Sequence, residues 1–154
     1  MRLRFSRTAD YGLRAALEVA RVPDGPLVTR RAIAGATGAP TSVLAQALAG
    51  LVRGGVLAAH AGRNGGYRLA RAADEVTIHD VVMAVDGPDR EERCVLSDGV
   101  CSWEGACPFH GFLVAAQERF IDALRDTSLA DVLGGPPPLF MPRDGRATSE
   151  ETSC

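Results

Sequence analysis

The 154-residue chain has no lysine, few aromatic residues and no long apolar run. A membrane-spanning helix needs about 20 consecutive apolar residues, and no stretch of the sequence approaches that length. Residues 1–5 also lack the apolar stretch and the small-residue cleavage site of a signal peptide. The sequence therefore predicts a cytoplasmic protein with no membrane partner.

Motifs that carry catalysis are absent from the sequence as well. It contains no Gly-Lys-Ser/Thr phosphate loop, no Gly-x-Ser-x-Gly elbow, no His-Glu-x-x-His zinc motif and no dinucleotide fingerprint after a predicted strand. We therefore expect a protein that is not an enzyme. The apolar share of 46% is enough for a packed core, so a globular fold is expected.

The formal net charge of −2 conceals a segregation of charge along the chain. Up to Arg71, eleven arginines oppose three acidic residues, which gives +8; after Arg71, six arginines oppose sixteen acidic residues, which gives −10. A basic N-terminal half suits contact with the phosphates of double-stranded DNA. The acidic half would repel DNA and is expected to face elsewhere.

The basic half predicts three helices from the spacing of its apolar residues. They cover about 8–22, 30–36 and 41–52, with Thr8, Thr29 and either Thr41 or Ser42 as their N-caps. A short turn that contains Gly38 joins the second helix to the third, as a helix-turn-helix requires. The third helix is therefore the candidate recognition helix.

Polar side chains on these helices are the candidates for DNA contact. On the third helix they are Thr41, Ser42 and Gln46, and a glutamine amide can bond adenine in a bidentate way. Arg30 and Arg31, at the start of the second helix, are candidates for phosphate contact.

Two extended segments follow the third helix and predict a β-hairpin. Residues 56–60 and 66–70 flank a five-residue connection in which Asn64-Gly65 is a strong turn signal. The hairpin is interpreted as a wing. Arg63 lies at its tip, where a guanidinium can enter a narrow minor groove.

The acidic half predicts a helix over 76–85, a long helix over 109–125 and a short helical turn over 128–133. The long helix carries an apolar face too large to leave in water, which predicts a homodimer. The expected division is a winged helix-turn-helix domain over 1–72, a connecting helix, cysteine loop and dimerisation helix over 73–133, and a disordered tail over 134–154.

Three cysteines, Cys94, Cys101 and Cys107, follow one another with the spacing Cys-x6-Cys-x5-Cys, and no fourth cysteine lies near them. In a reducing cytosol such a cluster is more typical of metal binding or redox chemistry than of structural disulfides. An iron–sulfur cluster, a zinc ion held with a nearby histidine, and plain thiol sensing all fit this spacing. The cysteine at the C-terminus, Cys154, is expected to be inert.

Together, the segments 7–20, 62–69 and 76–87 and the cysteine loop resemble, in this order, the Rrf2 family of transcriptional regulators, which includes the IscR and NsrR types. The resemblance covers about residues 1–133. It implies a dimeric winged-helix regulator, mainly α-helical with a small β-hairpin, that binds a palindromic operator. It also implies a [2Fe-2S] or [4Fe-4S] cluster that senses nitric oxide, redox state or iron–sulfur status.

The family's three cysteine ligands correspond to Cys94, Cys101 and Cys107. Its fourth ligand corresponds either to Asp10, supplied by the other subunit, or to His110, three residues after the last cysteine. A thiol- or zinc-based winged-helix regulator is the alternative within this class. A small iron–sulfur electron-transfer protein is the alternative from another class, although it leaves the basic half of the chain unexplained.

Overall fold

The computed structural model describes residues 5–23, 25–87 and 107–135. These residues form, in chain order, α1 (Arg7–Ala20), α2 (Arg30–Thr37), α3 (Thr41–Arg53), β1 (Leu57–His60), β2 (Gly66–Leu69), α4 (Ile78–Asp86), α5 (His110–Asp126) and α6 (Leu129–Gly134). The predicted fold class, mainly helical with one small β-hairpin, is confirmed. Within the described ranges, no helix combines the length and apolar character that crossing a bilayer would require.

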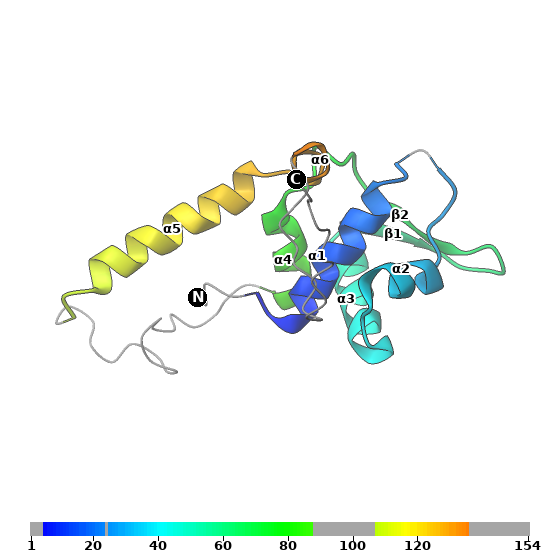
Figure 1. The fold of residues 1–154 in the computed structure, drawn as a ribbon, viewed down its shortest axis with the longest axis horizontal. Helices are drawn as coiled ribbons and strands as arrows, with labels where there is room; N and C mark the ends of the chain where they lie inside the picture. Colours follow the sequence, from blue (N-terminus) through cyan, green and yellow to red (C-terminus); the bar gives the residue numbers. More distant parts are fainter. Residues whose placement is uncertain (1–4, 24, 88–106, 136–154) are drawn as a thin grey trace, which may run out of the picture.

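Helix α1 lies at the centre of the molecule, with α2, α3 and the hairpin on one side and α5 extending from the other (Figure 1). It contacts α2, α3, α4, α6 and β2. The largest fully buried side chains come from almost every element around it: Val19, Ile33, Leu44, Leu48, Leu51, Val56, Leu57, Val76, Val81 and Leu129. Burial of each such side chain stabilises the fold by about 1.5–3 kcal/mol.

The N-cap of α1 is Ser6 and not Thr8, so this prediction was wrong. The Ser6 hydroxyl accepts a hydrogen bond from the Ala9 N–H at 3.0 Å and donates one to the Asp86 carboxylate at 2.5 Å. Asp86 ends α4, 80 residues away along the chain. This long-range partner holds the Ser6 hydroxyl, and local sequence does not reveal the pairing.

The other helix starts are capped in two ways. Thr29 caps α2 as predicted, by accepting from the Ala32 N–H at 3.2 Å. In contrast, neither Thr41 nor Ser42 caps α3, because the N-cap is Pro40 and no side chain bonds the first turn. The φ of −56° at Pro40 suits this position, and Thr41 and Ser42 are thereby placed inside the helix with exposed side chains.

The hairpin pairs β1 and β2 in antiparallel register, with Ala59 opposite Tyr67. Its turn is centred one residue earlier than the Asn64-Gly65 signal predicts, since the Gly65 N–H donates to the Gly62 carbonyl at 3.0 Å. Gly62 has a φ of +113°, and a Cβ on Gly65 would lie 2.4 Å from the His60 carbonyl oxygen. The two glycines that flank the turn therefore shape it, and Arg63 occupies its centre.

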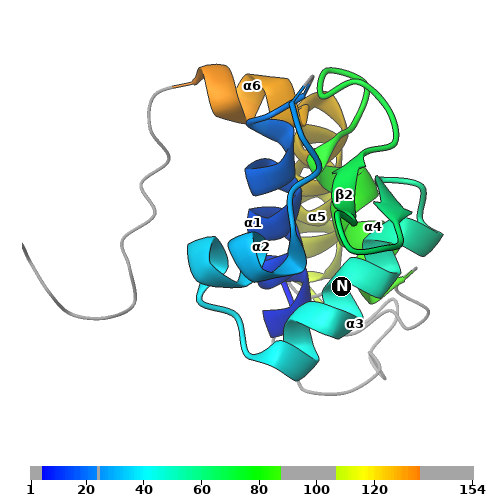
Figure 2. The same ribbon diagram turned by 90° about the vertical axis from the view of Figure 1, so that its right-hand side faces the viewer.

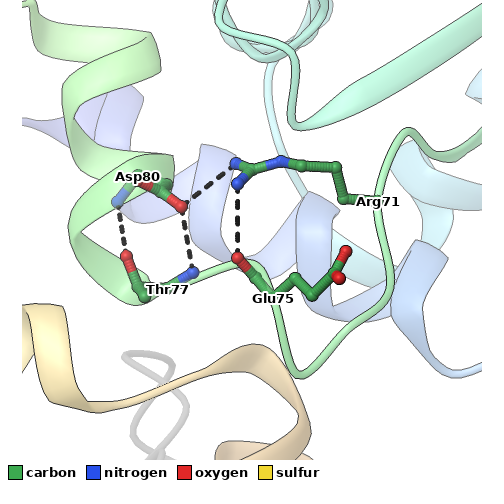
Figure 3. A network of polar contacts seen from close by, with 4 residues as sticks. All are labelled: Arg71, Glu75, Thr77 and Asp80. Carbon is green, nitrogen blue, oxygen red and sulfur yellow. Dashed lines mark hydrogen bonds and ion pairs between the residues drawn. The ribbon is translucent and has the colours of Figure 1, made fainter.

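A polar network joins the end of the hairpin to the start of α4 (Figure 3). Arg71 donates to the Glu75 carbonyl at 3.3 Å and to the Asp80 carboxylate at 3.1 Å. Asp80 also accepts from the Thr77 N–H, while Thr77 caps α4 by accepting from the Asp80 N–H. The helix consequently starts after Thr77, two residues later than predicted, and Val76 remains in an extended segment whose carbonyl accepts from Leu129.

Helices α5 and α6 differ in how they are held. None of the residues of α5 is buried in the single chain, whereas α6 is fixed by Leu129, which is fully buried. Ser128 and Asp131 form a capping box at the start of α6. The Ser128 hydroxyl, together with the Ser128 N–H, holds the pKa of Asp131 below its ordinary value.

Substitution of Gly50 by alanine is expected to lower the free energy of unfolding by about 1–2 kcal/mol. A Cβ there would lie 2.8 Å from the Ala84 carbonyl oxygen and 3.2 Å from the Val85 Cα, so α3 and α4 would have to separate. Such overpacking costs about 1–3 kcal/mol, which outweighs the helix propensity that alanine gains.

The matched control for this change is Gly35→Ala in α2, where no atom lies within 4 Å of the added Cβ. It is expected to stabilise the protein by up to about 1 kcal/mol. Urea unfolding at one protein concentration measures both variants, and a shift of the same sign for the two would contradict the close approach of α3 and α4.

Candidate functional site

Helix α3 has one buried and one exposed side. Its buried residues are Leu44, Ala47, Leu48, Gly50 and Leu51. Its exposed residues are Thr41, Ser42, Gln46, Ala49 and Arg53. From Ser42 on, the exposed residues recur at helical spacing and form a single stripe. The three polar residues predicted on this helix therefore all lie on the surface away from the core.

Helix α2 is tied to the start of α3 by Arg30, whose Nη2 donates to the Thr41 carbonyl oxygen at 3.2 Å. Gly38, with a φ of +64°, ends α2 in the left-handed conformation and allows the sharp change of direction. Arg31 is exposed beside Arg30. Arg30 thus lies next to the first turn of α3, as a phosphate contact beside a recognition helix would require.

Arg63 is exposed at the centre of the hairpin turn. The hairpin, α2 and α3 face the viewer in Figure 2, with α5 behind them. On α3 and the hairpin strands, the sequence interpretation missed two exposed cations: Arg53, the last residue of α3, and Arg68, on β2. The spacing of seven residues between Gln46 and Arg53 places them on one side of the helix and could have revealed the first of these.

The cysteine site falls partly within the described residues. Cys107 is half-buried and lies directly before α5, and its carbonyl accepts from the His110 N–H at 3.1 Å. The structure therefore joins Cys107 to His110 through the backbone of one turn. Cys94 and Cys101 lie outside the described residues. Among the residues described, no group of three His, Cys, Asp or Glu side chains is placed to hold a metal ion.

Asp10 lies in the first turn of α1, and both of its carboxylate oxygens accept from Arg14. The two contacts, Nε to Oδ1 and Nη2 to Oδ2, are each 3.2 Å long. The Arg14 guanidinium also lies over the Tyr11 ring, 5.8 Å from its centroid. The first turn of α5 is remote from α1 (Figure 1), so a single chain does not bring Asp10 and Cys107 together.

An exposed helix after a glycine turn, next to a hairpin with an arginine at its tip, is the arrangement of a winged helix-turn-helix protein. The chain belongs to the Rrf2 family, described as an iron-dependent transcriptional regulator, which it matches over residues 5–135. Its class is therefore that of DNA-binding transcriptional regulators, and it is not an enzyme.

Known proteins that resemble the chain include a bacterial repressor and two proteins of solved structure. The chain is 32% identical over 136 residues to the HTH-type transcriptional repressor NsrR of Streptomyces coelicolor, covering 87% of this chain and 90% of that protein. CymR (YrzC), the global cysteine regulator of B. subtilis, has the same fold, with a TM-score of 0.69, 23% identity and coverage of 86% and 97% of the two chains. IscR of T. potens also shares it, with a TM-score of 0.66, 23% identity and coverage of 86% and 87%.

Proposed function

We propose that this protein is a homodimeric regulator that binds a palindromic operator and whose affinity for DNA is controlled by an iron–sulfur cluster on Cys94, Cys101 and Cys107. The observation that carries the proposal is the separation of two surfaces on opposite sides of α1. Helix α3, which carries the polar stripe, lies on one side, and α5, which begins just after Cys107, extends from the other (Figure 1). The relative named a repressor supports repression as the direction of control.

DNA binding in this proposal uses Ser42 and Gln46 in the major groove and Arg63 in the minor groove. Thr41, Arg30 and Arg31 flank the first turn of α3 and contact phosphates. Two half-sites of a palindrome are separated by about 34 Å, or one helical turn of the duplex. The spacing between the two recognition helices must match that distance, so the dimer helix α5 determines which operators the protein binds.

Dimer formation is supported by the apolar surface of α5. Phe112 is 71% exposed, and Phe109, the N-cap three residues before it, is 57% exposed in the single chain. Side chains of this kind clustered on one helix favour a protein partner. In a two-fold symmetric dimer, α5 of the second subunit covers this apolar surface.

The donor set suits an iron–sulfur cluster. Three thiolates with one carboxylate or imidazole hold either a [2Fe-2S] or a [4Fe-4S] cluster, and the weaker fourth ligand favours a labile centre over a stable electron carrier. When bound, the group supplies reactivity towards nitric oxide and oxidants. The residues of the chain supply the ligands and the connection from that centre to the DNA-binding helices.

Contacts in the described residues support such a connection. Asp86, the last residue of α4, precedes the cysteine segment and accepts from both the hydroxyl and the N–H of Ser6. Ser6 in turn caps α1, against which α3 packs. A change in the cysteine segment that displaces the end of α4 is therefore transmitted to the first turn of α1.

The proposal is tested on protein purified without oxygen. Absorption and Mössbauer spectra, with iron and sulfide analysis, are recorded before and after nitric oxide or brief oxidation, and duplex binding is followed against salt concentration. We expect about one cluster per chain and a steep fall in DNA affinity with salt. Protein with no iron or sulfide after attempted reconstitution overturns the cluster, and bound zinc in its place identifies the zinc-based alternative.

The fourth ligand is identified by comparing Asp10→Ala with His110→Ala. A single site has one fourth position, so we expect one of the two variants to lose its cluster faster than wild type, by about tenfold or more, and the other to match wild type. The loss of cluster absorbance in air or with a chelator measures the lifetime.

The control for Asp10 is Arg14→Ala, which removes the same ion pair but keeps the carboxylate. If both Asp10→Ala and His110→Ala retain the wild-type cluster lifetime, the fourth ligand is neither residue. If Arg14→Ala shortens the lifetime as much as Asp10→Ala does, the effect comes from the ion pair and not from ligation.

A further inference from the structure

We infer that α3 reads adenine–thymine pairs directly, through Gln46 and Ala49, and offers guanine no bidentate partner. This inference rests on the proposed function, because it names the class of DNA sequence that the recognition helix binds. It follows from which side chains α3 exposes and from the hydrogen-bonding chemistry of those side chains.

The exposed stripe of α3 limits what can touch bases. Ser42, Gln46, Ala49 and Arg53 are exposed and recur at intervals of four, three and four residues, whereas the opposite side of the helix packs into the core. This stripe is the most exposed side of α3, so it is the side that can face into a major groove. We therefore assign the direct reading of bases by α3 to residues of this stripe.

The chemistry of the stripe is matched to adenine and thymine. Glutamine bonds the N6 and N7 positions of adenine in a bidentate way, and an alanine methyl group contacts the thymine methyl group, whereas arginine or lysine is the usual bidentate partner of guanine. Gln46 and Ala49 are three residues apart, about 4.5 Å along the helix axis, which is close to the step of about 3.4 Å between base pairs. The two side chains therefore read neighbouring base pairs.

The arginines close to the stripe are assigned other contacts, and Arg31 is assigned to phosphate in the proposed function. Arg53 ends α3, about 10 Å beyond Gln46 along the axis, and base contacts come from the N-terminal part of a recognition helix, so Arg53 is assigned to phosphate. Arg30 is anchored by its Nη2 to the Thr41 carbonyl oxygen. Arg63, on the hairpin, favours narrow minor grooves, which are typical of A-tracts. Arg63 therefore adds, in the minor groove, a preference for the same adenine–thymine pairs.

The test is selection from a library of fully randomised DNA duplexes with the full-length protein, followed by sequencing of the bound pool. Wild type is expected to enrich palindromes with adenine at one fixed position of each half-site and a thymine-containing pair beside it. Gln46→Ala should weaken the preference for that adenine by roughly tenfold. Gln46→Arg should replace it by guanine, and Arg53→Ala should weaken binding to all sequences without changing the motif.

Three outcomes overturn the inference while leaving DNA binding intact. They are a wild-type motif with guanine at the position that Gln46→Ala alters, a motif unchanged in Gln46→Ala, and a guanine preference that disappears in Arg30→Ala. Circular dichroism of each variant confirms that the fold is retained, as expected for exposed positions. If the wild-type protein binds no DNA duplex at low salt, the proposed DNA-binding role itself fails. This result is distinct from the other three.

Discussion

Replacement of Cys107 by alanine is expected to abolish cluster binding and to leave the fold intact. Cys107 is proposed to hold the cluster through its thiolate, which a methyl group cannot replace, so iron and sulfide should fall from about one cluster per chain to background. The side chain lies before the first turn of α5, is only half-buried and contributes nothing to the hydrophobic core. Its removal should therefore change the free energy of unfolding by less than about 1 kcal/mol.

The matched control for this variant is Cys154→Ala, in the cysteine that sequence analysis assigns no role. Iron and sulfide analysis with absorption spectra, on proteins purified side by side without oxygen, gives the comparison. Wild-type cluster content in Cys107→Ala would mean that Cys107 is not a ligand. An equal loss in both variants would mean that the cluster depends on thiols in general and not on this site.

The helices of the DNA-binding half could be predicted from sequence because their signals are local. Thr29 starts α2, with the Ala32 N–H three residues later as its partner, and this predicted cap occurs in the structure. The spacing of Leu44, Leu48 and Leu51 likewise predicts which side of α3 is buried. Such features depend on residues within one or two turns, so a single sequence contains them.

Features that depend on distant residues could not be predicted. Ser6 caps α1 with its hydroxyl held by Asp86, and no local pattern indicates that pairing. Gly50 has no turn or cap to explain it until α4 is placed against α3. These are the contacts that join the acidic half of the chain to the basic half, and the structure is needed to find them.

In the candidate DNA-binding site, too, the sequence predicts local features but not contacts between helices. The exposure of Ser42 and Gln46 follows from helical periodicity, and the structure has both residues on the surface. The bond between Arg30 and the Thr41 carbonyl does not follow from it, because it depends on the angle between α2 and α3. That bond distinguishes Arg30 from its neighbour Arg31 and gives it a positioning role in addition to any contact with phosphate.

Substitution of Phe112 by aspartate is expected to convert the dimer to a monomer and to weaken binding to a palindromic operator by about a hundredfold or more. Phe112 is 71% exposed in the single chain, so in the monomer the new carboxylate remains in water and the fold is kept. In the dimer the same carboxylate would be buried without a partner, at a cost of several kcal/mol. A monomer binds one half-site and loses the gain from simultaneous binding of both.

Light scattering during gel filtration gives the oligomeric state, and titration of a duplex taken from the wild-type selection gives the affinity. The control is Asp122→Ala on the same helix, where an exposed ion pair with Arg125 at 3.6 Å is removed. Surface pairs of this kind contribute at most about 1 kcal/mol, so this variant should remain dimeric. A Phe112→Asp protein that stays dimeric would place the dimer contact on another surface. The spacing of the two recognition helices would then have to be set by a part of the chain other than the Phe112 side of α5.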